Sequence, residues 1–532
     1  MRMEHIRAVL VHPAEMTVGA QLNRHGVQQL LEQEGAPLSV LPAGELEQTE
    51  LGGADVLVVA EDGCLTEAEE AAIVEAARSL PLIWCGLPRE DASAELLALL
   101  GIGRAQYSRD GIVRSLTLRD HLVTRPFGRD HEAHLKLKHI PHLTAGTQIE
   151  GAEVLTIGVL DGMRLAPGLV LRDDSPRRAV FTFPLGLLFA LANCRHIDIR
   201  KDAEWLDWPV MAYVDVLRAL LTRLLRWARP DDRLARVYYW PTADGARPTG
   251  VLSLTHDLCG YSEAGVAWIC ETCARYGVPT TFFDMPPLRL DAGEVGEHCI
   301  ALHVSDGTPQ EEIDQGLRDL RERHGREILG WRRHGATQMS NYPGIWRRIE
   351  QAGIVWANTW PAQSHPNRAT CSPCGTSNRL PFDLMDLESG RRMGLVELAI
   401  FDTDDADRLG SIGYGMRLNW EQFVDVVARR LDHAAKHHVI AGYLLHGWTA
   451  GVGEESGTTY GAAEARAMLP HIIEQARARG MAIMDGDEIY RWWTFRRGCR
   501  IEFGPDGPTL AAPDDRYRTE LDVYPPMADE DY

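Results

Sequence analysis

Short apolar runs and stretches with helical periodicity alternate along the first hundred residues of the chain. The apolar runs lie at 7–11 (RAVLV), 54–60 (ADVLVVA) and 80–86 (LPLIWCG), and the amphipathic stretches VQQLLEQEG and TEAEEAAIVEAARS separate them. Strands and helices that alternate at this spacing predict a parallel sheet with crossover helices. Strands that are apolar throughout predict that both faces of the sheet are covered. We therefore expect an N-terminal α/β domain with a doubly wound, flavodoxin-like parallel sheet.

Further strands are expected at VLTIGVL, PGLVLRD and RAVFTFPLG, and a long amphipathic helix is expected over 209–227. The stretch that follows, ARPDDRLARVYYWPTADGARPTG, is rich in proline, glycine and charge, as linkers between domains often are. The first domain is therefore expected to span 1–229.

The alternation restarts at VLSLTHD (251–257) and continues to MAIMDG (481–486). About seven strand–helix units over roughly 240 residues are typical of a closed or nearly closed β/α barrel. We place this distorted barrel at 230–500. The acidic segment 501–532 is expected to be an irregular tail on the surface.

Four of the expected barrel strands end in polar side chains suited to metal chemistry. They are 255–257 (Thr-His-Asp), His303, the pair Arg332 and His334, and His446. In a parallel barrel the C-terminal ends of the strands meet at one mouth. Imidazoles and a carboxylate around an open position hold a divalent metal, which polarises a carbonyl and lowers the pKa of a bound water. We therefore expect these side chains to converge on one site.

These strand ends resemble the motifs of the polysaccharide deacetylase family, which includes the chitooligosaccharide deacetylases. LSLTHDLCGY resembles the first motif, IALHVSDG the second, GWRRHGATQM the third, and GYLLHG the late motif whose histidine assists catalysis. The resemblance, which covers about 251–495, implies removal of an acetyl-like group from an amino sugar or small glycoconjugate. It implies a divalent metal, with zinc favoured, held by Asp257, His303 and His334. Asp257, Arg332 and His446 are the implied catalytic residues.

The chain departs from the family pattern at two positions. The first motif usually offers two acidic residues, whereas Leu258 and Cys259 follow Asp257 here. A second histidine usually follows the first by four residues, where this chain has Gly307. His334 can replace the missing imidazole, and Cys259 or Asp306 can supply another ligand. Asp257 then serves as metal ligand or as base, and the sequence leaves this open.

Two alternatives follow from these departures. The first is a catalytically degenerate protein that binds carbohydrate or assists assembly on the same barrel. The second is a glycosidase that uses two carboxylates, for which Asp284, Asp306, Asp402 and Asp404 lie near expected strand ends.

The N-terminal half resembles the class I glutamine amidotransferase-like fold in its arrangement. The candidate nucleophiles, Cys64 and Cys85, lack the glycine pattern of a nucleophile elbow and an evident histidine partner. We expect this domain to be non-catalytic.

Three other patterns are interpreted as structural. Cys270-x-x-Cys273 and Cys371-x-x-Cys374 match a four-thiolate zinc site by spacing, but the first pair falls within an expected helix. The tryptophans are expected mainly in the core, although some can stack on sugar rings; they are Trp346, Trp356, Trp360, Trp492 and Trp493. HAAKHH (433–438) is expected on a solvated helix face.

Composition restricts the partners. The formal net charge is −21, with 76 acidic and 55 basic residues, which disfavours nucleic acid and anionic membranes. No stretch approaches the roughly 18 apolar residues of a membrane span, and the N-terminus has no apolar signal region. Ten cysteines are too sparse for a disulfide scaffold. We expect a cytoplasmic protein that acts on a carbohydrate. The oligomeric state is not predicted.

Overall fold

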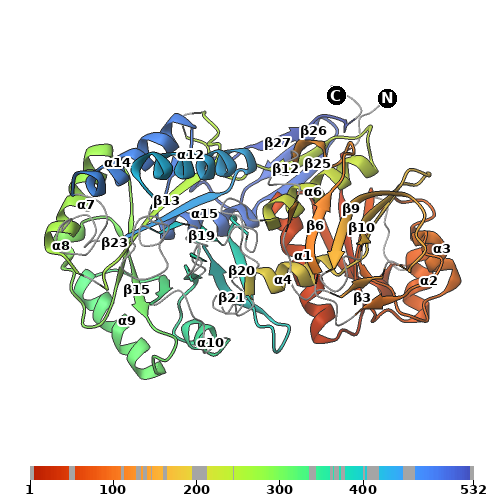
Figure 1. The fold of residues 1–532 in the computed structure, drawn as a ribbon, viewed down its shortest axis with the longest axis horizontal. Helices are drawn as coiled ribbons and strands as arrows, with labels where there is room; N and C mark the ends of the chain where they lie inside the picture. The colour runs from red at the N-terminus through yellow and green to blue at the C-terminus, as the bar shows by residue number, and fades with distance from the viewer. Residues whose placement is uncertain are drawn as a thin grey trace.

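Two α/β lobes lie side by side along the long axis of the molecule (Figure 1). In this computed structural model the described residues are 5–46, 54–108, 113–127, 134–135, 141–144, 146–159, 165–194, 213–243, 245–259, 261–334, 343–359, 363–364, 371–372, 378–398, 402–403, 418–446 and 462–527.

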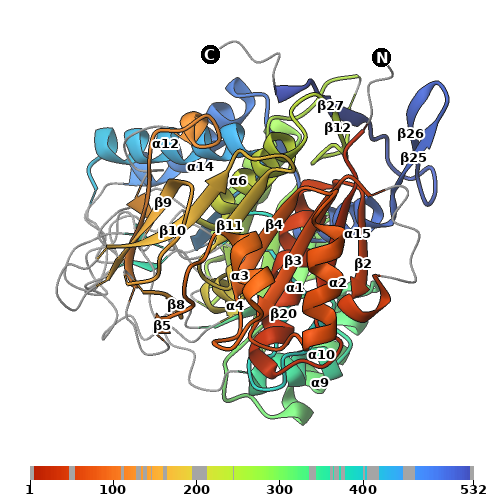
Figure 2. The same cartoon turned by 90° about the vertical axis from the view of Figure 1, so that its right-hand side faces the viewer.

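The N-terminal lobe is built on a mixed sheet of nine strands. Its order is β2 (Leu38–Pro42), β1 (Ala8–His12), β3 (Val56–Asp62), β4 (Leu82–Leu87), β11 (Arg178–Phe181), β10 (Leu165–Arg172), β9 (Ala152–Val159), β6 (Val113–Leu118) and β7 (His134–Leu135). The strands from β2 to β11 are parallel, and those from β11 to β7 are antiparallel. Figure 2 shows β9, β10, β11, β4 and β3 side by side.

The sheet therefore differs from the wholly parallel, flavodoxin-like sheet that we expected. A parallel pair needs a crossover of about a dozen residues or more. The few residues between Val159 and Leu165 are too short for that, so β9 and β10 pair antiparallel.

Helices pack around this sheet, and their ends follow from local sequence. They are α1 (Val18–Glu34), α2 (Glu67–Ala76), α3 (Ala94–Leu100), α4 (Leu185–Cys194) and α6 (Tyr213–Ala228). The Thr17 side chain caps α1 by accepting the Ala20 N–H, and Gly35 ends the helix in the left-handed region, with φ of 69°. Thr66 and Glu69 form a capping box at the start of α2.

The C-terminal lobe contains a ten-stranded, largely parallel sheet. Its order is β20 (Phe382–Met385), β21 (Arg392–Glu397), β17 (Trp356–Ala357), β16 (Gly330–Arg333), β15 (Cys299–Val304), β14 (Thr281–Asp284), β13 (Val251–Asp257), β23 (Ile440–His446) and β22 (Asp402–Thr403), and β24 (Ala482–Ile483) also pairs with β13. Only β20 runs antiparallel to its neighbour among the described pairs. No described pairing joins β20 to β22, so closure into a barrel is not shown.

The helices of this lobe follow the predicted alternation closely. They are α7 (Glu263–Tyr276), α8 (Ala292–Val295), α9 (Gln310–His324), α10 (Gly344–Gln351), α12 (Trp420–His437), α14 (Ala462–Ala478) and α15 (Gly486–Gly498). The first strand, β13, has the predicted bounds of 251–257.

The C-terminal segment is more ordered than we expected. Strands β25 (Arg500–Gly504) and β26 (Gly507–Ala511) form a hairpin, and β27 (Leu521–Tyr524) pairs with β12 (Leu234–Val237). Pro505 and Asp506 form the turn between β25 and β26, and Gly507, the first residue of β26, has φ of 116°, which glycine adopts readily. The segment 501–532 is therefore not an irregular tail over its described part.

Minor described pairs complete the list of strands: β5 (Tyr107–Ser108) with β8 (His142–Leu143), and β18 (Gln363–Ser364) with β19 (Cys371–Ser372).

Helix α12 corrects one sequence interpretation. His433 and His437 are buried, and His433 Nε2 lies 3.4 Å from Asp215 Oδ2 of α6. Burial lowers the pKa of His433 to about 4. This histidine-rich face packs against the N-terminal lobe instead of facing solvent, because α6 covers it.

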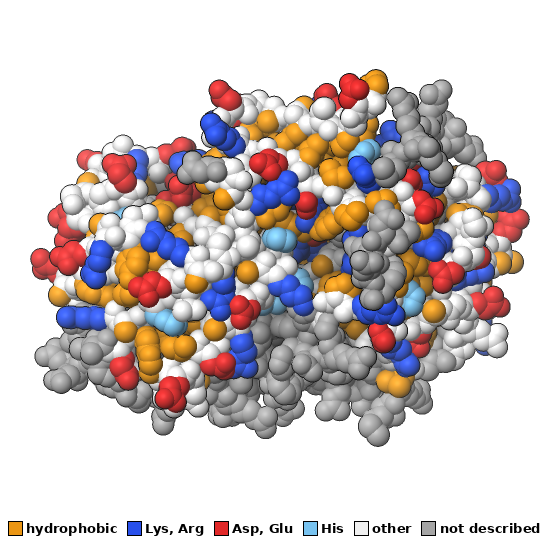
Figure 3. All heavy atoms as spheres, turned by 90° about the horizontal axis from the view of Figure 1, so that it is seen from above, with side chains coloured by type: hydrophobic (Ala, Val, Ile, Leu, Met, Phe, Trp, Pro, Cys, Tyr) orange, Lys and Arg blue, Asp and Glu red, His pale blue; other side chains and the backbone are white. Residues whose placement is uncertain are grey.

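Two further features concern the surface charge and the hydropathy of the helices. Acidic and basic side chains are interspersed over the face seen in Figure 3, without a broad region of one sign. Within the described residues, no helix is both long enough and apolar enough to cross a membrane.

Candidate functional site

The strand register brings the predicted site residues to one edge of the C-terminal sheet. Asp257, the last residue of β13, is opposite His446, the last residue of β23. On neighbouring strands, His303 of β15 is opposite Arg332 of β16. His334 is the first residue after β16, and its backbone N–H donates to Val304 O at 3.0 Å. The predicted convergence at the C-terminal strand ends is thus present in the structure.

Asp257 and Arg332 form a buried ion pair at this edge. Arg332 Nη1 donates to Asp257 Oδ1 at 2.7 Å, and Nη2 donates to Thr255 Oγ1 at 2.8 Å. Arg332 Nε donates to Asn358 Oδ1 at 2.9 Å, and the guanidinium lies 3.9 Å from the Phe283 ring centroid. This network holds the Arg332 side chain on several sides.

The ion pair keeps Asp257 ionised. Burial by itself would raise the pKa of Asp257, but the Arg332 guanidinium and the nearby His303 and His446 outweigh it and lower that pKa. Because one carboxylate oxygen accepts from Arg332, Oδ2 is the oxygen that faces His303, with Nε2 at 3.7 Å.

Asn358 was not identified from the sequence. It follows β17 directly, within the predicted strand VWANTW, so the rule that polar side chains gather at strand ends would have included it.

The two imidazoles lie close together beside a thiol. The rings of His303 and His334 are 5.1 Å apart between centroids and nearly perpendicular. Cys259, His303 and His334 each offer one ligand atom, and these three atoms lie within 4.8 Å of one another. Such a donor set fits a divalent first-row metal ion.

Outer contacts orient both imidazoles toward this point. The carbonyl oxygen of Arg332 lies 3.2 Å from His303 Nδ1, so Nδ1 carries the hydrogen and donates. In a neutral ring, Nε2 of His303 then has a free lone pair, and it has no hydrogen-bond partner within the described part of the chain. Ser305 Oγ lies 3.4 Å from His334 Nδ1. Metal-binding histidines are commonly held this way.

Cys259 has the electrostatic character of a thiolate. Burial opposes its ionisation, but the adjacent imidazoles of His303, His334 and His446 outweigh burial and lower the pKa of Cys259 to about 4. In return, Cys259 raises the pKa of His334.

The carboxylates proposed for a glycosidase are engaged elsewhere where they are described. Asp284 accepts the backbone N–H groups of Met285, Arg289 and Leu290. Asp306 is paired with the buried Arg333. The side chain of Asp402, and Asp404 as a whole, lie outside the described residues.

The thiol and tryptophan patterns have structural explanations. Cys270 and Cys273 lie on α7, and burial raises their pKa values to about 11 and about 12. The side chain of Cys371, and Cys374, lie outside the described residues, as does Trp360. The other tryptophans are buried in the core as expected: Trp346, Trp356, Trp492 and Trp493.

The N-terminal lobe does not display an elbow nucleophile in its described part. Cys85 lies within buried strand β4, and burial raises its pKa. Cys64 is partly exposed, 3.7 Å from Thr17 Oγ1. The amidotransferase-like resemblance stays a prediction.

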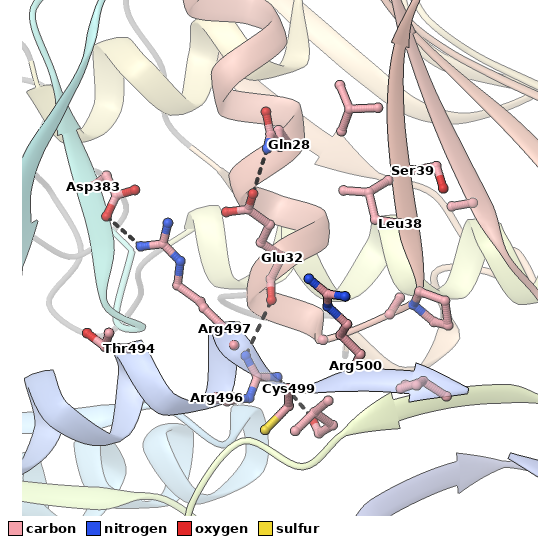
Figure 4. A pocket seen from close by; sticks show the side chains of 18 of the residues that line it. Gln28, Glu32, Leu38, Ser39, Asp383, Thr494, Arg496, Arg497, Cys499 and Arg500 are labelled. Carbon is pink, nitrogen blue, oxygen red and sulfur yellow. Dashed lines mark hydrogen bonds and ion pairs between the residues drawn. The ribbon is translucent and has the colours of Figure 1, made fainter. Parts of the chain in front are cut away.

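A separate cavity of about 1230 Å³ lies between the lobes. Figure 4 shows its walls, which come from α1, β2, β20, α15 and β25, and the ion pair between Arg497 and Asp383 that crosses it. None of the predicted site residues lines this cavity.

Comparisons with known proteins give distant similarities. No family model and no curated protein matches the chain. Among solved structures, a protein assigned as a polysaccharide deacetylase from Mycobacterium smegmatis is 16% identical over 46% of this chain and 95% of its own, with a TM-score of 0.29. A ThuA-like protein from Bacteroides uniformis is 11% identical over 44% of this chain and 94% of its own, with a TM-score of 0.31.

A family 4 acetyl xylan esterase from Clostridium thermocellum, in complex with cobalt, is 15% identical over 45% of this chain and 90% of its own, with a TM-score of 0.26. Similarity this low carries no functional argument.

Proposed function

We propose that the protein is a metal-dependent amidohydrolase that removes an acetyl-like acyl group from an amino sugar or a small glycoconjugate. The observation that carries the proposal is the convergence of a carboxylate and imidazoles from separate strands at one sheet edge, with the ligand atoms of His303 and His334 within 4.8 Å of each other. The order of the sequence motifs supports the substrate class.

The two imidazoles would hold the metal. A divalent cation at such a site polarises a carbonyl oxygen and lowers the pKa of a coordinated water. His303 and His334 are already oriented by Arg332 O and Ser305 Oγ, so little side-chain freedom is lost on binding.

Asp257 would serve as the general base. The sequence left it as either ligand or base, and the ion pair favours the second role, because Arg332 takes Oδ1 and leaves Oδ2 to receive a proton from the attacking water. The lowered pKa of Asp257 keeps this oxygen ionised in the free protein. Arg332 therefore acts as the positioning residue for the base.

His446 would serve as the general acid. It is paired in register with Asp257 across β13 and β23, and both side chains are buried at the strand ends. An imidazolium beside the base can protonate the departing amine nitrogen. Proton removal and proton delivery are then assigned to two neighbouring strand ends.

The proposal is tested by metal content and deacylation together. We expect purified protein to bind a divalent metal and to release acetate from N-acetylated chitooligosaccharides. H303A and H334A should lose both properties. The matched control is H324A, because His324 ends α9 at the amino end of β16, away from the site. Unchanged metal content in H303A and H334A would contradict the proposal.

A second candidate is a binding protein without catalysis on the same scaffold. It is favoured by the replacement of the second acid of the first motif by Cys259 and of the second histidine by Gly307. Binding of chitooligosaccharides measured by calorimetry, with no acetate release at saturating metal, would support this candidate.

A further inference from the structure

We infer that Cys259 supplies the third protein ligand of the metal centre as a thiolate, and that the centre therefore selects a thiophilic cation such as Zn²⁺ over Mn²⁺ or Mg²⁺. The inference rests on the proposed function for the presence of a metal. It adds the ligand set and the class of ion.

Cys259 lies close to both imidazoles. It lies two residues beyond the end of β13, and its sulfur is within 4.8 Å of the ligand nitrogens of both His303 and His334. These two come from the neighbouring ends of β15 and β16. Three donors thus come from three different strands and point at one place.

The two carboxylates near this place each have an arginine partner and lie outside the group of mutually close donors. Asp257 gives one oxygen to Arg332 and lies outside the group of three mutually close donors. Asp306 is paired with Arg333, and its backbone oxygen accepts from Arg348. In the described part of the chain, the thiol is the third donor that can join the two imidazoles.

The chemistry of the donor set determines which ion it prefers. Three protein ligands with an open position are typical of catalytic zinc sites, and one cysteine with histidines is among the known sets. Soft thiolate ligands favour zinc, whereas carboxylate and water suit magnesium and manganese. A thiolate from Cys259, in place of a carboxylate, therefore shifts the preference of the site toward zinc. It also leaves Asp257 free to act as the base.

Cobalt substitution tests the inference with a spectroscopic readout. Metal-free protein is titrated with Co²⁺, and we expect a thiolate-to-cobalt charge-transfer band in the near ultraviolet that zinc abolishes. C259S and C259D should lack this band. C64S is the matched control, because Cys64 is also partly exposed but lies in the other lobe, and it should keep the band.

Metal competition gives the second readout. C259D should lower the ratio of Zn²⁺ to Mn²⁺ affinity by about tenfold or more, because a hard ligand replaces a soft one. An unchanged ratio in a folded C259D would overturn the inference.

Alkylation of the wild-type protein requires no variant. Iodoacetamide should modify Cys259 in metal-free protein and not after zinc loading, as mapped by peptide mass spectrometry, while Cys64 reacts in both samples. Modification of Cys259 regardless of zinc would overturn the inference.

The failures of the two proposals are distinguishable. If the wild type binds cobalt without a charge-transfer band, the Cys259 inference fails and the proposed function stands. If the wild type binds neither cobalt nor zinc, both fail.

Discussion

The contacts of Asp257 bear on the choice between metal ligand and base that the sequence left open. Its carboxylate is buried, is paired with Arg332 and lies outside the group of Cys259, His303 and His334, whose ligand atoms lie close together. A carboxylate held in this way is suited to accept a proton, and the soft donor beside it is suited to bind a metal.

The exchange D257N tests this division. The amide keeps the shape of the carboxylate but cannot accept the proton, so we expect kcat for deacetylation to fall by about 10²–10⁴-fold while metal content stays unchanged. Steady-state kinetics and metal analysis of the same preparation give both values. D291N is the control, because the Asp291 side chain is exposed. Loss of metal in parallel with activity would show that Asp257 is a ligand.

Glu61 provides a residue-scale test in the other lobe. It is buried near the end of β3, where Oε1 accepts the N–H groups of Cys64 and Leu65. Burial raises its pKa from 4.5 to about 8. At pH values between 4.5 and about 8, the Glu61 carboxyl is ionised in the unfolded chain and protonated in the folded chain. The folded state binds more protons there, so stability falls as the pH rises.

The isosteric exchange E61Q should remove this pH dependence, because the amide does not ionise and still offers an oxygen to both N–H groups. Each unit of pKa difference corresponds to about 1.4 kcal/mol. We expect E61Q and wild type to have similar stability near pH 5 and E61Q to be more stable by a few kcal/mol at pH 8. Denaturant unfolding at several pH values measures the difference, and parallel profiles would refute it.

The segments at the ends of β15 and β16 are linked to each other by an ion pair. Asp306, three residues after His303, pairs with Arg333, which directly precedes His334. Both side chains are buried. The pair therefore links the two segments that carry the imidazoles.

Weakening this link should weaken metal binding. We expect D306N to reduce zinc affinity by about 10–100-fold, as changes to outer-shell partners typically do. D306E should restore part of the affinity, because it restores the charge for Arg333. D319N, on the exposed face of α9, should have no effect. Affinities come from competition with a chromogenic chelator, and equal affinity in D306N and wild type would exclude a positioning role for this pair.

The elements that the sequence predicted well are those whose signal is local. The apolar strand VLSLTHD and the amphipathic stretch of α12 carry their own periodicity. Polar side chains at the C-terminal ends of β13, β15, β16 and β23 marked the edge of the sheet where the site was expected. The burial of His433 was missed because it depends on α6, some two hundred residues away in sequence. Likewise, the closeness of Cys259 to His303 and His334, and the exclusion of Asp257 from that group, depend on tertiary structure that the sequence pattern does not give.

Helix α1 of the N-terminal lobe also contacts the C-terminal lobe. Its Gln29 side chain exchanges hydrogen bonds with the backbone of Asp383 in β20, at 3.1 Å and 2.7 Å. Its Glu34 carboxylate accepts hydrogen bonds from Arg218 of α6 and Arg236 of β12. Arg218 Nη2 in turn donates to His437 O of α12, in the C-terminal lobe, at 3.2 Å. One apolar core cluster also includes residues of both lobes. These contacts predict that the lobes unfold together.

Glu34 is the test of that coupling. Burial by itself would raise its pKa, but Arg218 and Arg236 outweigh burial and lower it, so the carboxylate is ionised. E34Q would remove the anion that Arg218 and Arg236 share, while Arg236 keeps its ion pair with Asp522. Removing one partner of a buried ion pair typically costs about 3–5 kcal/mol, so we expect a loss near the lower end of this range. We expect a lower denaturation midpoint and transitions that no longer coincide between probes of the two lobes.

The matched control is E75Q, which breaks the ion pair between Glu75 and Arg78. Both of these side chains are more than half exposed, at 70% and 61%, so the loss should stay below about 1 kcal/mol. Hydrogen–deuterium exchange of peptides from each lobe, followed through the denaturation transition, compares the three proteins; tryptophan fluorescence would not separate the lobes, because tryptophans lie in both. If E34Q behaved like E75Q, the buried charge network would not be what couples the lobes, and the shared apolar core would have to account for their association.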